Sequence, residues 1–300
     1  MAEAAPNLLD PQAVSEAESL GMQARSVVEG YLAGNHKSPF RGFSVEFTQH
    51  REYVPGDDLR HLDWKVLGKS DRYYIKQYEQ ETNFICHILV DGSESMKYGS
   101  GKVTKLAYAK QMAAVLAYVI LGERDAVSLT LFDNDVKHYI PRTGNLASIH
   151  NIMTTLANFQ PTQATSIAPV LHQIARTNPR KGIVILISDC FDDEQAILDG
   201  IQHLRFGGHE VIVFQVLDHN EIDFPFKGNV EFIGYEGTGR QTTRPNEIRK
   251  SYLAAINAFI DTIKFGCEKN KVHYVQVTTQ HPLHETLTGY LAFRKRTTTK

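Results

Sequence analysis

The sequence predicts an α/β fold: a mostly parallel sheet, doubly wound with helices on both faces. From residue 83 onward, apolar runs of strand length alternate with segments of helical pattern. Runs such as NFICHILVD (83–91) and GIVILISD (182–189) are nearly all apolar, which is typical of strands buried on both faces. DVKHYI (135–140) follows AVSLTLFD (126–133) across Asn134, so we predict a hairpin there and one antiparallel edge strand.

The remaining predicted elements after residue 83 continue the alternation of strands and helices. A long helical pattern runs from Lys105 to Leu121, with Gly122 as its C-cap. Further strands are EVIVFQVLD (210–218) and KVHYVQVTT (271–279). A looser region containing Pro225, Gly228, Gly234 and Gly237 lies between them. The other predicted helices cover 145–158, 166–176, 193–205, 246–265 and 283–291.

The first 82 residues differ in composition. Ser15–Leu32 has a helical pattern, and Ser15 with Glu18 forms a capping box at its start. Residues 38–80 are rich in glycine, aromatic and charged residues, with strand patterns in FSVEF (43–47) and RYYIKQYE (72–79). We therefore predict a helical segment over 1–37, an accessory segment over 38–82 and the α/β domain over 83–300.

Composition and charge narrow the class of protein. The formal net charge of −2 gives no electrostatic reason to expect a nucleic-acid partner or an anionic lipid. The three cysteines lie far apart, which favours a reducing compartment. No signal peptide opens the sequence, and no apolar run approaches the roughly 20 residues of a spanning helix. We expect a cytoplasmic protein without a membrane span.

Two of the predicted strands end in aspartate, at Asp91 and Asp189. Ligands of parallel α/β sheets bind beyond the carboxyl ends of the strands, so both carboxylates are expected at that rim. Asp91 begins the string DGSES, in which Ser93 and Ser95 can direct hydroxyls at one point. Oxygen-only ligands suit hard cations such as Mg²⁺. Taken alone, however, the string is equally compatible with a turn that caps a helix.

Two further segments make the pattern specific. DGSESM, QATSIAPVL (163–171) and ILISD (185–189) together resemble a von Willebrand factor A domain, a Rossmann-like α/β fold. That family's metal-ion-dependent adhesion site takes ligands from three loops. The resemblance implies a divalent cation, Mg²⁺ first with Mn²⁺ or Ca²⁺ as alternatives, held by Asp91, Ser93, Ser95, Thr165 and Asp189.

The accessory segment resembles the bacterial family called domain of unknown function 58, whose members carry a motif of this kind immediately before an A-type domain. Its elements here are Arg51-Glu52-Tyr53, Gly56-Asp57-Asp58, Arg60 and Asp63-Trp64. Many members carry membrane helices before this motif. The resemblance implies an association with MoxR-type AAA+ ATPases. We interpret Asp57, Arg60, Asp63 and Trp64 either as a second functional surface or, preferably, as a buried ion-paired clasp.

The function that these observations favour is a non-enzymatic adaptor whose cation captures an acidic side chain on a partner or client protein. Phosphate-loop look-alikes at Gly68-Lys69-Ser70 and Gly99–Lys102 lack the required residues, and no GxSxG elbow occurs. One alternative is a metal-dependent phosphoryl-transfer enzyme, with Glu94 or Asp192 as the base. Another is a scaffold in which the cation is purely structural.

Overall fold

The computed structural model of the 300-residue chain describes residues 45–54, 63, 64, 66, 68, 73–80, 85–122, 125–161, 166–178, 180–234, 239–283 and 286. The chain divides into two compact units, one containing Val28–Asn83 and the other Phe84–Lys300. The helix predicted over 15–32 lies outside the described residues. Of the helix predicted over 283–291, only Leu283 and Thr286 are described, and both are helical.

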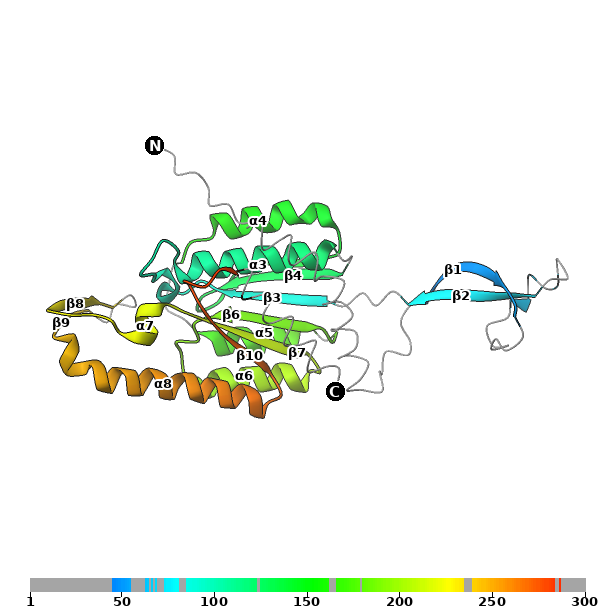
Figure 1. Cartoon of the computed structure of the whole chain (residues 1–300). Coiled ribbons are helices and arrows are strands. Elements are labelled where there is room, and N and C mark those ends of the chain that lie inside the picture. The colour runs from blue at the N-terminus through cyan, green and yellow to red at the C-terminus, as the bar shows by residue number, and fades with distance from the viewer. Residues whose placement is uncertain are drawn as a thin grey trace, which may run out of the picture. The chain divides into compact units, whose positions relative to one another are not determined.

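The second unit is built on a six-stranded sheet with the order β10-β7-β6-β3-β4-β5 (Figure 1). Every neighbouring pair is parallel except β4 with β5. This confirms the predicted α/β fold class, a doubly wound, mostly parallel sheet with one antiparallel edge strand. The strands are β3 (Ile85–Asp91), β4 (Ala126–Phe132), β5 (Val136–Thr143), β6 (Ile183–Ser188), β7 (Glu210–Leu217) and β10 (His273–Thr278).

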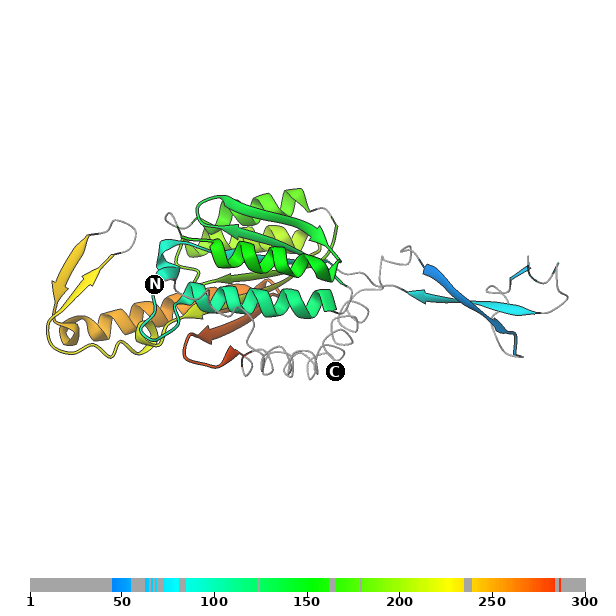
Figure 2. The same cartoon turned by 90° about the horizontal axis from the view of Figure 1, so that it is seen from above.

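Helices cover both faces of this sheet: α3 and α4 lie on one face, and α5, α6 and α8 on the other (Figures 1 and 2). Their buried residues recur at three- and four-residue spacing, as in Ile197, Ile201 and Leu204 of α6, because such residues share one helix face. These faces pack on strand residues such as Val184 and Val213. The helices are α3 (Lys105–Gly122), α4 (Ile149–Asn158), α5 (Ile167–Thr177), α6 (Glu194–Phe206) and α8 (Pro245–Lys269). Among the described residues, none of the helices combines the length and the apolar character that a bilayer span requires.

A small subdomain follows β7, where the sequence predicted only a looser region. It consists of α7 (His219–Asp223) and an antiparallel hairpin of β8 (Val230–Ile233) and β9 (Arg240–Thr243). Phe224 anchors it through ring contacts with Phe226, Phe232 and Tyr252. The hairpin lies at the end of the domain where β3 meets the following loop (Figure 1). Strands of four residues between glycines and a proline gave too little periodicity for the prediction to find them.

The first unit contains an antiparallel pair, β1 (Val45–Glu52) and β2 (Tyr74–Gln80). The strand predicted over 72–79 coincides with β2, whereas the strand predicted over 43–47 overlaps β1 only at residues 45–47. Within it, Asp63 is buried and accepts a hydrogen bond from the backbone N–H of Val66 at 3.3 Å, so it begins a helical turn. Trp64 is 65% exposed in the structure. Asp57 and Arg60, the other residues of the predicted clasp, lie outside the described residues.

The edge strand β5 is built differently from the central strands. It carries Lys137, Pro141 and Arg142, and most of its residues are exposed. Its register against β4 shifts between Val127 and Leu129, opposite the segment that contains Pro141. Proline has no N–H for a ladder, so it is tolerated at such an irregular edge.

The loop after β3 is held in place by close packing at Gly92. Its N–H donates to the carbonyl of Phe132 at 2.7 Å, and the buried ring of Phe159 covers its Cα. A Cβ at this position would lie 1.9 Å from Phe159 Cε1. No side chain larger than hydrogen fits at residue 92 without moving that ring.

We therefore expect Gly92→Ala to lower the free energy of unfolding by roughly 1–3 kcal/mol, since it overpacks a filled site. Chemical denaturation monitored by circular dichroism measures this. Gly101→Ala is the control, because a Cβ there meets nothing within 4 Å. Phe159→Leu should recover part of the loss in Gly92→Ala. Equal stabilities of the two alanine variants would contradict the packing argument.

A buried histidine lies within β3. His87 is 4% exposed, its Nδ1 lies 2.7 Å from Ser128 Oγ, and its ring is 5.9 Å from that of the buried His209. Burial, and to a lesser extent His209, lowers the pKa of His87 to about 4. The folded protein therefore keeps this imidazole neutral at pH values where the unfolded chain protonates it.

Because the folded pKa lies below the unfolded value of 6.5, stability should fall as the pH drops from 6.5 to 4. The contribution of this one residue is on the order of 3 kcal/mol. His87→Asn should show a shallower loss across that window in urea unfolding at fixed pH values. The exposed His150, changed to Asn, serves as the control and should behave like the wild type.

Candidate metal-binding site at the carboxyl ends of the strands

Four neighbouring strands of the sheet end in a buried aspartate. Asp91 is the last residue of β3, and Asp133, Asp189 and Asp218 directly follow β4, β6 and β7; each of the four is 0% exposed. Each accepts a hydrogen bond through Oδ1 from the N–H two residues further on, as Ser93 N donates to Asp91 at 2.9 Å. This is the turn that aspartate side chains favour. Asp91 and Asp189 were predicted from the sequence as rim carboxylates, whereas Asp133 and Asp218, which follow strands in the same way, were not.

Asp91 lies at the centre of this row. Its second oxygen, Oδ2, accepts a hydrogen bond from Ser188 Oγ at 2.5 Å. Burial raises the pKa of Asp91 to about 7, and the nearby charge of Asp189 contributes in the same direction. The structure therefore brings the two predicted carboxylates close enough to repel one another. A positive charge nearby would stabilise the ionised form of both carboxylates.

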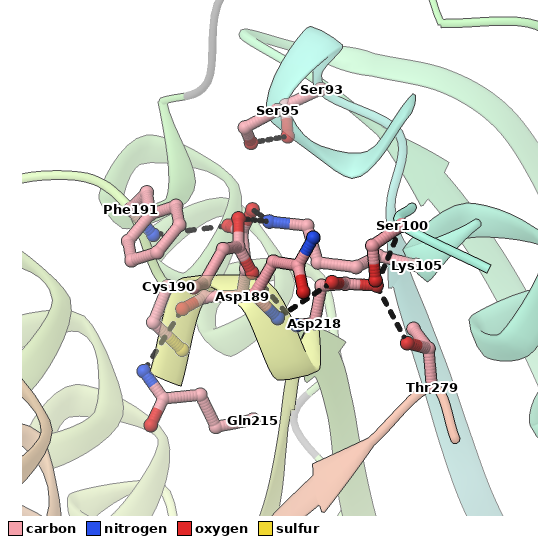
Figure 3. Close-up of polar contacts among 12 residues, drawn as sticks. Ser93, Ser95, Ser100, Lys105, Asp189, Cys190, Phe191, Gln215, Asp218 and Thr279 are labelled. Atoms are coloured by element: carbon pink, nitrogen blue, oxygen red, sulfur yellow. Dashed lines mark hydrogen bonds and ion pairs between the residues drawn. The ribbon is translucent and has the colours of Figure 1, made fainter. Parts of the chain in front are cut away.

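The hydroxyls of Ser93 and Ser95 lie 2.9 Å apart on the loop after β3, turned toward each other (Figure 3). Ser95 belongs to a single turn of 3₁₀ helix, η2 (Glu94–Lys97). Glu94, between the two serines, forms an ion pair with Lys97 at 3.0 Å. Two hydroxyls and the carboxylate of Asp91 are thus presented from five residues of chain.

Thr165, the remaining residue of the predicted set, lies outside the described residues. The chain immediately after it is described and is tied to the rim. Ser166 N donates to the carbonyl of Asp133 at 3.2 Å, and Ile167 N donates to Asp192 Oδ2 at 2.8 Å. The start of α5 therefore lies at the same edge of the sheet as the strand-end aspartates.

Asp189 already has a positively charged neighbour, which was not predicted from the sequence. Lys105, the first residue of α3, is fully buried, and its Nζ lies 2.8 Å from Asp189 Oδ2 (Figure 3). The same Nζ lies 2.6 Å from Glu221 Oε1. Burial alone would lower the pKa of Lys105, but Asp189 and Glu221 raise it above its ordinary value. The ammonium is therefore charged. The Asp218-x-x-Glu221 spacing was the available signal for Glu221, whereas nothing local marked Lys105.

Asp218 caps helix α7 and connects it to two neighbouring segments. Together with Glu221 it forms the capping box of α7, and its Oδ2 accepts hydrogen bonds from Ser100 N at 3.0 Å and Thr279 Oγ1 at 2.8 Å (Figure 3). These hydrogen bonds outweigh the effect of burial and hold the pKa of Asp218 below its usual range. Asp218 thus links α7 to the end of β10 and to the loop before α3.

The residues present fit a hard divalent cation. Asp91, Ser93, Ser95 and Asp189 offer only oxygen donors, which Mg²⁺ and Ca²⁺ prefer. Within the described ranges, no three His, Cys, Asp or Glu side chains form a metal-holding group, so a transition-metal site of that composition is not present there. With all three carboxyl groups of Asp91, Asp189 and Glu221 ionised, their negative charge would exceed the charge of Lys105 by two. A divalent cation would balance that excess.

Comparison with known proteins agrees with the sequence motifs. The chain is 24% identical over 226 residues to the uncharacterized protein Rv1480 of Mycobacterium tuberculosis (strain ATCC 25618 / H37Rv), covering 74% of this chain and 70% of the relative. BatB from Bacteroides thetaiotaomicron is similar in structure, with a TM-score of 0.48 and 19% identity over 71% of this chain and 99% of BatB. The SpRpn10 VWA domain gives a TM-score of 0.42 at 12% identity over 69% and 95%. The model of the family described as "Protein of unknown function DUF58" matches residues 49–258, and the chain therefore belongs to that family.

Proposed function

We propose that this chain is a non-enzymatic adaptor that binds one divalent cation and uses it to hold a partner protein. The ligands are Asp91, Ser93, Ser95, Thr165 and Asp189. The observation that carries the proposal is the pair of buried strand-end carboxylates beside two hydroxyls that lie 2.9 Å apart. Mg²⁺ is the first candidate, because this donor set contains oxygen alone.

The donor set suggests how a partner would be held. Mg²⁺ takes six oxygen ligands and readily keeps several waters. Two carboxylates and three hydroxyls leave room for another ligand, and an acidic side chain of the partner would supply it. The affinity for the partner should then depend on the cation.

The partner class follows from the family resemblance. We propose a MoxR-type AAA+ ATPase, with the adaptor presenting it to a client complex during assembly or maturation. Since such an ATPase needs ATP, this interaction would take place in the cytoplasm.

Contacts of the two candidate bases favour an adaptor over a phosphoryl-transfer enzyme. Glu94 is paired with Lys97 at 3.0 Å. Asp192 accepts hydrogen bonds from Ile167 N and Asp193 N, both at 2.8 Å, so it caps α5 and the turn before α6. A base that activates water would have to give up these contacts.

Asp91→Asn should abolish Mg²⁺ or Mn²⁺ binding in isothermal titration calorimetry. It should also raise the melting temperature of the metal-free protein at pH 8, because it removes one of two mutually repelling buried carboxylates. The matched control is Asp199→Asn, an exposed aspartate of α6. Unchanged metal affinity in Asp91→Asn would show that the site is misassigned.

Partner capture provides the second test. A co-expressed MoxR-type AAA+ ATPase should co-purify with the wild type in Mg²⁺ and be lost in EDTA or in Asp91→Asn. If EDTA lowers the melting temperature while the ATPase stays bound, the cation is structural and the scaffold alternative is correct. If the ATPase is absent under all conditions, the proposed partner class is wrong.

A further inference from the structure

The ammonium of Lys105 lies between two carboxylates of different elements. Asp189 follows β6 and is a predicted metal ligand, whereas Glu221 belongs to α7 and is not. The two Nζ–oxygen distances, 2.8 Å and 2.6 Å, make both contacts full ion pairs. Lys105 and Asp189 are 0% exposed and the Glu221 side chain is 13% exposed, so water screens these charges weakly.

A divalent cation bound by Asp189 would compete with this ammonium for the same carboxylate. If the cation is held by Asp189 while Lys105 Nζ stays on Oδ2, two positive centres share one carboxylate in a buried site. Like charges at that separation repel strongly where the dielectric is low. The repulsion is relieved if the ammonium leaves Asp189. A buried ammonium cannot be left without a partner, however.

We propose that Lys105 is a resident cation that neutralises Asp189 until a divalent cation takes its place, and that Glu221 then holds the displaced ammonium. This inference rests on the proposed metal site and names its regulation. Lys105 thereby weakens cation binding, and Glu221 makes cation binding feasible. The pair adjusts the site so that it responds to changes in cation concentration.

Glu221 is fixed well enough to serve as the holding group. Its Oε2 accepts a hydrogen bond from Asp218 N at 2.8 Å, and its carbonyl accepts one from Tyr252 Oη at 3.0 Å. The ring of Phe191 lies 4.7 Å from Lys105 Nζ and offers its face to the ammonium. The displaced side chain would therefore keep one carboxylate and one aromatic face.

A double-mutant cycle with Mn²⁺ titrations tests the inference. Lys105→Met, which is close in length and uncharged, should bind Mn²⁺ at least tenfold more tightly than the wild type. Glu221→Gln keeps an acceptor for the capping box and should bind at least tenfold more weakly. In the Lys105→Met background, Glu221→Gln should change the affinity less than twofold, because no ammonium remains to be held. Lys250→Met, an exposed lysine of α8, controls for the loss of one positive charge.

Weaker or unchanged binding in Lys105→Met would overturn the inference and leave the metal site standing, since Lys105 would then be a support for Asp189. A Glu221→Gln effect of equal size in both backgrounds would overturn it too, because Glu221 would then act on the cation directly. If no variant binds Mn²⁺, both the inference and the proposed function fail. If Lys105→Met is unfolded without metal, Mn²⁺ should restore its thermal transition. Failure to do so, with unchanged affinity in Glu221→Gln, would also overturn the inference.

Discussion

The ion pairs of one buried ammonium hold together the carboxyl end of the sheet. Lys105 joins the start of α3 to Asp189 after β6 and to Glu221 in α7, and none of the three charges can stay buried without the others. Asp218 extends the connection from α7 to Ser100 and to Thr279 after β10. Segments up to 179 residues apart in the sequence, from Ser100 to Thr279, thus depend on a single polar network.

The four strand-end aspartates have a structural role that does not depend on metal binding. At the end of each parallel strand the chain turns into a loop. An aspartate there stabilises the turn when its carboxylate accepts a hydrogen bond from the N–H two residues further along the chain. Asp91, Asp133, Asp189 and Asp218 all do this. Asp133 also forms an ion pair with Lys137. Asp218 also accepts hydrogen bonds from Ser100 and Thr279. Asp91, at the end of β3, and Asp189, directly after β6, lie close enough for their charges to interact, and Asp189 is in addition paired with Lys105.

Periodicity and strand length predicted the six-stranded sheet and the helices around it because central parallel strands are almost uniformly apolar. The same reasoning placed Asp91 and Asp189 at the rim. It could not separate a capping aspartate from a ligand, since both obey the same turn chemistry. It also missed Lys105, whose two partners are 84 and 116 residues away, and the β8–β9 hairpin, whose strands have four residues each. Contacts of that separation leave no local signal. The prediction that Thr165 is a metal ligand depends on family resemblance alone.

The irregular edge strand has a consequence for how the protein can associate. An exposed strand edge invites a second sheet to pair with it, and the resulting aggregation is avoided by proline, charge and bulges. β5 has all three, in Pro141, in Lys137 and Arg142, and in its register shift against β4. Sheet-to-sheet addition is therefore blocked on that side. A high local concentration of the chain should therefore not lead to polymerisation through β5.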